Sequence, residues 1–134
     1  GRDRPGRQEV TPDPVAIDEH MIGRLVDHFY ARIRLDPDLG PIFEAAVADW
    51  DAHRTLLISF WSAVMLKSGG FKGQPVQTHR ALPNLTGRHF EIWLRMFADS
   101  ALAVCPPDAA ELFIDRSRRI GSSLSRAVLD RAVP

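Results

Sequence analysis

The side chains best suited to chemistry in this sequence belong to two histidines, a tyrosine and a tryptophan. His79 lies in the stretch GQPVQTHRALPNL, residues 73–85, where glycine and proline interrupt regular structure and apolar residues flank the imidazole. Tyr30, His53 and Trp93 fall within apolar runs spaced as on one face of a helix. An imidazole can ligate a metal, and a phenol or an indole can donate a hydrogen bond to a bound molecule.

Taken one at a time, these residues have ordinary explanations. A tyrosine or a tryptophan can fill a core while a local partner satisfies its OH or NH. A histidine on an apolar face is more often a satisfied core residue than a ligand. Taken together, polar groups from three helices and a fourth segment would need partners within one small core. A buried polar cofactor would supply them.

Among cofactor and active-site types, a haem fits these residues best. A zinc site is disfavoured because His20, His28 and His89 fall off the apolar stripes and no cysteine or carboxylate cluster completes four ligands. A Ser/His/Asp hydrolase is disfavoured because there is no nucleophile elbow. In a haem site, one neutral imidazole binds the iron, and an apolar pocket with a few donors faces the ligand. His79 is the candidate axial ligand.

The elements that position these residues are predicted to be helices, because apolar residues recur at helical spacing without strand-like alternation. The first helix follows Asp18, a predicted N-cap, and ends near DPDLGP, residues 36–41, where proline and glycine break it. Ile42 and Phe43 then start a short apolar turn. The second stripe covers residues 50–65 and ends at the following SGG.

The second half of the chain is also predicted to be helical, and the fold class is therefore all-α. The prolines leave room for a single short turn around His79. A helix then runs from about Thr86 to the prolines at 106–107. Asp108 followed by Glu111 resembles a capping box that would open the last helix.

Length and composition indicate a single domain. A chain of 134 residues with 45% hydrophobic content suits one core, here assigned to residues 15–134. Residues 1–14 contain three prolines and three arginines with almost no apolar content, which predicts a flexible arm.

Charge and hydropathy bear on partners and location. The 17 basic and 17 acidic residues balance, so no whole-chain field attracts nucleic acid or an anionic membrane. No apolar run approaches the roughly 20 residues that span a bilayer, and the start lacks the apolar core of a signal peptide. The single cysteine, Cys105, cannot form an intramolecular disulfide. A cytoplasmic protein is expected.

Three stretches resemble a known family. They are FYARIRLDPDLGPIF at 29–43, HRTLLISFW at 53–61 and GQPVQTHRALPNLTGRHFEIWLRMF at 73–97. In order and spacing they are similar to the truncated haemoglobins, and more narrowly to the third group of that family, over about residues 15–132. The resemblance implies a reduced globin fold, a two-over-two sandwich of helices around a haem b.

The resemblance also implies a role for each site residue. His79 would be the proximal iron ligand, Tyr30 the distal phenol, His53 the gate histidine of the distal helix, and Trp93 the distal indole. The pocket walls would be Phe43 on the haem face, Leu57 on the distal side, and Phe60 with Trp61 further inside. Cations near the proximal segment that could pair with the propionates are Arg80, Lys72 and Arg88, with surface solvation the alternative for each.

The predicted function is the binding of dioxygen and other diatomic ligands, including nitric oxide and carbon monoxide, at a five-coordinate iron. Two distal donors would slow ligand release, which favours nitric oxide, peroxide or redox chemistry over oxygen transport. Whether the protein is an enzyme stays open, since nitric oxide dioxygenation would need an external reductase. The alternatives are a haem-based gas sensor and a haem-free helical binding module.

Overall fold

Six helices make up most of the described chain. The computed structural model describes residues 16–67, 73, 75–80, 82 and 85–129. The helices are α1 (Glu19–Ile33), α2 (Leu39–Ala46), α3 (Trp50–Leu66), α4 (Pro75–Arg80), α5 (Gly87–Val104) and α6 (Pro107–Leu129). No strand occurs within the described residues, and the all-α prediction is confirmed. The arm predicted for residues 1–14 lies outside the described residues.

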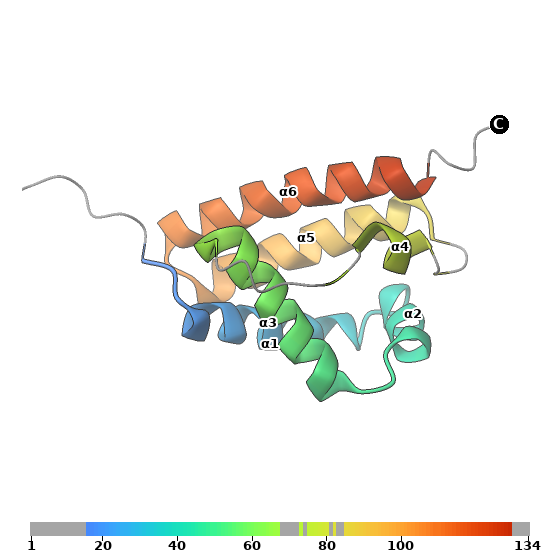
Figure 1. Cartoon of the computed structure of the whole chain (residues 1–134), viewed down its shortest axis with the longest axis horizontal. Coiled ribbons are helices and arrows are strands. Elements are labelled where there is room, and N and C mark those ends of the chain that lie inside the picture. Colours follow the sequence, from blue (N-terminus) through green and yellow to red (C-terminus); the bar gives the residue numbers. More distant parts are fainter. Residues whose placement is uncertain (1–15, 68–72, 74, 81, 83–84, 130–134) are drawn as a thin grey trace, which may run out of the picture.

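Two helix pairs form the sandwich. Helices α5 and α6 lie side by side along one edge of the molecule, and α1 and α3 cross beneath them (Figure 1). Helix α1 packs against both α3 and α5 and therefore joins the two pairs. The short helix α4 packs on α6 near its C-terminal end. No helix in the described part of the chain is long and apolar enough to cross a membrane.

The core where the pairs meet is rich in aromatic rings. Phe29 of α1, Phe97 of α5 and Phe113 of α6 are fully buried. Phe97 stacks on Trp61 and on Trp93, with ring centroids 4.9 and 5.4 Å apart, and Phe29 contacts it edge-on at 5.3 Å. Stacked and edge-on rings stabilise a core beyond the area that they bury. This cluster fixes α1, α3 and α5 relative to one another.

Several helix ends agree with the sequence prediction. The Asp18 carboxylate accepts a hydrogen bond from the Met21 backbone N–H at 2.9 Å, as expected of an N-cap. Helix α3 ends at Leu66, and Lys67 adopts a left-handed conformation with φ of 56°. Thr86 directly precedes α5, and a six-residue helix carries His79.

Two predicted helix boundaries are wrong. Residues 36–41 are not a continuous break, because α2 begins at Leu39 and contains Pro41 in its first turn, where a missing N–H costs no hydrogen bond. The Asp36 carboxylate caps this helix by accepting from the Leu39 N–H at 2.8 Å. Gly40 is required here, since a Cβ would lie 2.8 Å from the Arg34 carbonyl oxygen.

The second wrong boundary is the start of the last helix. Helix α6 begins at Pro107, so Asp108 lies inside its first turn and cannot act as the N-cap of a capping box. Proline suits the first helical position because its φ is preset and its missing N–H has no partner there. The Pro106 carbonyl already accepts the first helical hydrogen bond, from the Ala110 N–H at 2.9 Å.

Candidate functional site

A cavity of about 480 Å³ lies among the helices, and its walls are mostly apolar. It brings together the four residues that the sequence singled out: Tyr30 from α1, His53 from α3, His79 from α4 and Trp93 from α5. The other predicted wall residues also line it, namely Phe43, Leu57, Phe60 and Trp61. Segments far apart in the sequence therefore contribute to one site.

His79 is oriented by the backbone of its own short helix. Its Nδ1 lies 2.7 Å from the carbonyl oxygen of Pro75, one helical turn earlier. A carbonyl oxygen can only accept, so Nδ1 carries the proton and Nε2 keeps its lone pair. The ring is half-buried and lines the cavity. This arrangement fixes the tautomer and the ring orientation, and it leaves Nε2 as the nitrogen that can ligate a metal.

Tyr30 and Trp93 form a directed pair. Burial raises the pKa of the Tyr30 phenol above its usual range, and a hydrogen bond with the Trp93 side chain acts in the opposite direction. An indole N–H can only donate, so the phenol oxygen of Tyr30 accepts this bond. The phenol keeps its proton and can donate it to a further acceptor. Phe29 contacts both rings edge-on, at 4.9 and 5.5 Å, and supports their positions.

His53 is held without a hydrogen bond at Nε2. That nitrogen is buried and has no hydrogen-bond partner within the described part of the chain. Desolvation lowers the pKa of the imidazole below its ordinary value, so the ring favours the neutral form. Its neighbours are aromatic: Tyr30 at 5.4 Å, Trp50 at 5.9 Å and Phe43 at 6.5 Å between ring centroids. His53 therefore faces the cavity and the Tyr30 phenol.

Two of the three predicted propionate cations, Arg80 and Arg88, contact other groups of the protein in the described structure. Arg80 donates from Nε and Nη2 to the Ala127 carbonyl oxygen, at 3.1 and 2.8 Å, which ties α4 to α6. Arg88 Nη2 lies 3.6 Å from a carboxylate oxygen of Asp38. Lys72 lies outside the described residues. No lysine or arginine of the described ranges lines the cavity, and propionate pairing by these residues stays a prediction.

His89 is a cavity residue that the sequence reasoning placed off the apolar stripes. It lines the cavity, and its Nδ1 accepts a hydrogen bond from the Thr86 backbone N–H at 3.0 Å. This is the geometry of a capping box with histidine in place of the usual glutamate or glutamine. The sequence signal for this capping box is the Thr-x-x-His spacing before an apolar stripe. It was missed because histidine is unusual at the third helical position.

These features fit a haem. The cavity offers apolar walls, one imidazole whose Nε2 is available for ligation, and polar groups from α1, α3 and α5 that could face an iron ligand. No family model matches the sequence. However, the chain is 34% identical over 110 residues to the group 3 truncated haemoglobin of Campylobacter jejuni, covering 79% of this chain and 87% of that protein.

A solved structure agrees with this likeness. The fold matches the crystal structure of the group III truncated haemoglobin from Campylobacter jejuni with a TM-score of 0.80 and 32% identity, over 84% of this chain and 92% of that one. The chain belongs to the group III truncated haemoglobins. The family and the two-over-two globin fold predicted from the sequence are thereby confirmed. As a globin, the chain is a haem-binding protein.

Proposed function

We propose that the protein binds haem b with His79 Nε2 as the axial ligand, and takes a diatomic ligand on the side of Tyr30 and Trp93. The hydrogen bond from His79 to the Pro75 carbonyl supports this assignment, because it leaves only Nε2 for ligation. When bound, the haem would supply a five-coordinate iron. That iron would take dioxygen, nitric oxide, carbon monoxide or peroxide as a ligand, and it would supply the redox chemistry.

The observation that carries the proposal is that the Tyr30 phenol and the Trp93 indole line the same apolar cavity as the His79 imidazole. Trp93 donates to the phenol oxygen, so the Tyr30 proton is left for an acceptor in the cavity. A donor that itself accepts a hydrogen bond is polarised and becomes a stronger donor. Tyr30 is thus placed to donate to a bound dioxygen or peroxide molecule inside an apolar, low-dielectric cavity.

Such a donor favours chemistry over transport. A hydrogen bond to the ligand slows its release, and the same proton stabilises charge that develops on oxygen during peroxide or nitric oxide chemistry. His53, neutral and facing Tyr30, can accept or return a proton on this side. The function that fits best is peroxidase-like or nitric oxide dioxygenase activity in the cytoplasm, with electrons from an external reductase.

The test is the dissociation rate of dioxygen from the haem-loaded ferrous protein, wild type beside Tyr30→Phe. A net hydrogen bond of about 0.5–1.5 kcal/mol corresponds to an off-rate that rises roughly 2- to 12-fold when the donor is removed. Carbon monoxide, a poorer hydrogen-bond acceptor, is the control ligand, and its off-rate should change less. Loss of peroxide or nitric oxide turnover in the same variant is expected.

Two outcomes would contradict the proposal. An unchanged dioxygen off-rate in Tyr30→Phe would remove the phenol from this role. A purified wild type that stays colourless and helical after haem addition would instead favour a haem-free binding module.

A further inference from the structure

The orientation of His53 depends on packing rather than on hydrogen bonding. Its buried Nε2 has no partner among the described residues, so no hydrogen bond at that nitrogen fixes the ring. Three aromatic neighbours surround it, and two of them, Tyr30 and Phe43, line the cavity themselves. The third, Trp50, is not a lining residue and meets the imidazole nearly perpendicularly, at 88° and 5.9 Å. Trp50 therefore supports the ring from outside the cavity.

Trp50 is in turn held by a direct contact with Arg34, and indirectly by a bond from Arg34 to α2 and by the N-cap of α3. The guanidinium carbon of Arg34, at the C-terminal end of α1, lies 4.3 Å from the Trp50 ring centroid, within cation–π range. Arg34 Nε also donates to the Glu44 carboxylate of α2 at 3.2 Å. Trp50 is the first residue of α3, and the Asp49 carboxylate caps that helix through the Ala52 N–H at 3.1 Å. A series of contacts at the surface therefore leads from Glu44 of α2 through Arg34 and Trp50 to His53.

The cavity reaches the surface at this same corner. The α2–α3 connector, residues 47–49, lines it, as do the exposed residues Ala52 and Leu56 of α3. His53 lies on the same helix between Ala52 and Leu56 and also lines the cavity. A ligand entering beside the start of α3 passes the imidazole.

We propose that Arg34 and Trp50 are positioning residues that hold His53 turned into the cavity and thereby set the rate of ligand entry. This inference rests on the proposed function, since it takes the cavity as the ligand site. Neither residue lines the cavity. Trp50 also lies 6.0 Å from the Tyr30 ring between centroids, so the same substitutions in a His53→Ala background separate an effect through His53 from one through Tyr30. The Arg34 and Glu44 side chains are about half exposed, so the ion pair that holds Arg34 against Trp50 is weak enough to open in solution.

The experiment compares carbon monoxide association with the haem-loaded ferrous protein in wild type, Arg34→Gln and Trp50→Ala. Loss of the cation–π contact should speed carbon monoxide association by about two- to fivefold. This is the rate ratio that corresponds to the free energy of an exposed cation–π contact. The same substitutions in a His53→Ala background should have no further effect. A rate that stays constant in both single variants, or that rises equally without His53, would overturn the proposal.

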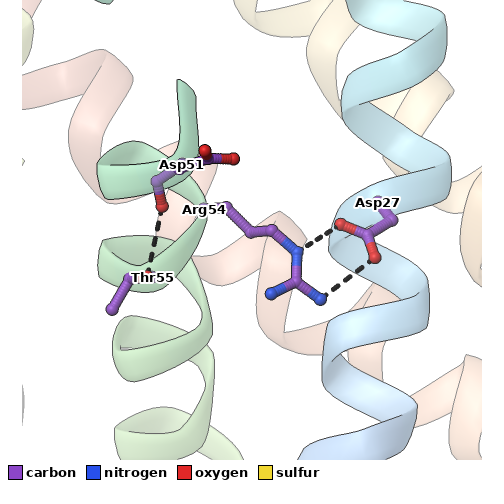
Figure 2. A network of polar contacts seen from close by, with 4 residues as sticks. All are labelled: Asp27, Asp51, Arg54 and Thr55. Carbon is purple, nitrogen blue, oxygen red and sulfur yellow. Dashed lines mark hydrogen bonds and ion pairs between the residues drawn. The ribbon is translucent and has the colours of Figure 1, made fainter. Parts of the chain in front are cut away.

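A matched control lies on the neighbouring residue. Arg54 follows His53 and binds Asp27 of α1 with two hydrogen bonds, at 2.6 and 3.1 Å (Figure 2). Among the described residues, the cation–π contact to Trp50 comes from Arg34 and not from Arg54. Arg54→Gln therefore removes an equally exposed link between α1 and α3 and should leave the association rate unchanged. An equal acceleration in Arg54→Gln would show that any loosening of α3 suffices, which would contradict a specific role for Arg34.

A second readout separates this proposal from the proposed function. In the diamagnetic carbon monoxide form, NMR titration of the His53 ring should show its pKa moving back toward the ordinary value in Trp50→Ala, because the ring gains solvent. An unchanged titration would overturn the inference. If the protein binds no haem, the proposed function fails while the same titration of the purified protein still tests the contact between Trp50 and His53.

Discussion

The two sides of the cavity hold their histidines in different ways. On the α4 side, a hydrogen bond to the Pro75 carbonyl at 2.7 Å fixes one nitrogen of His79 and leaves the other available. On the α3 side, His53 has a buried Nε2 without a partner in the described residues and lies among aromatic rings. A hydrogen bond fixes direction, as a metal ligand requires. Packing alone permits the ring to turn, as a residue beside a ligand path requires.

The supporting structure differs as well. The α3 side rests on the aromatic cluster around Phe97, where three long helices meet. The α4 side is a helix of six residues that packs mainly on α6 and is tied to it by the Arg80–Ala127 hydrogen bonds. A short helix gains little stability from its own backbone bonds, so the α4 side relies on its ties to α6.

The largest effect is expected from exchanging the two histidines for alanine. His79→Ala should lower haem affinity by more than about 100-fold, since removing even an outer-shell partner of a metal ligand typically costs about 10- to 100-fold. His53→Ala should keep the haem and its Soret band. Absorption spectra of the ferric and the ferrous carbon monoxide forms measure both. Matching spectra for wild type and His79→Ala would contradict the assignment of His79 as the iron ligand and would point to another axial ligand.

The next effect concerns the donors on the α1 and α5 side. Trp93→Phe removes the hydrogen bond to Tyr30 and should speed dioxygen release roughly 2- to 10-fold, the range of one net hydrogen bond. Stopped-flow dissociation in wild type, both single variants and the double variant shows how the two residues act. If Trp93 acts through Tyr30, it adds nothing in the Tyr30→Phe background. A product of the two single effects would mean that each donates to the ligand independently.

A smaller effect is expected for His89, the cavity histidine that caps a helix. His89→Ala removes the acceptor for the Thr86 N–H and should lower the free energy of unfolding by about 0.5–1 kcal/mol, the usual worth of a cap. Urea unfolding of the haem-loaded protein measures this loss. The absorption spectrum should stay as in wild type, and a lost or shifted Soret band would assign His89 to the haem instead.

The smallest effect is the pH dependence that His53 contributes to stability. Burial holds its pKa below the ordinary value of about 6.5, so at lower pH the unfolded chain binds a proton that the folded protein excludes. The free energy of unfolding should be highest above about pH 6.5 and fall as the pH decreases toward the lowered pKa. Urea unfolding of wild type and His53→Leu at matched pH isolates the contribution of His53 to the pH dependence of the free energy of unfolding. A wild type that loses no more stability at low pH than His53→Leu would show a solvated ring.

The sequence predicted much of this structure because the relevant signals are local. Apolar spacing and capping residues are read within one helical turn, and they located α1, α3, α5 and the short helix at His79. The start of α2 and that of α6 were misread because proline was taken as a break, whereas it is compatible with a first helical turn. The residue types of the site were also visible, since polar groups on apolar faces stand out.

What the tertiary structure alone decided is how those side chains meet. The Trp93–Tyr30 hydrogen bond joins residues 63 positions apart, and the Arg34–Trp50 contact joins the end of α1 to the start of α3. Neither leaves a periodic trace in the sequence, because such contacts depend on helix crossing and side-chain direction rather than on local spacing. The sequence by itself determined four of the helices, the family and the residue types of the site. Packing decided which nitrogen is free, which proton is available and which ring can turn.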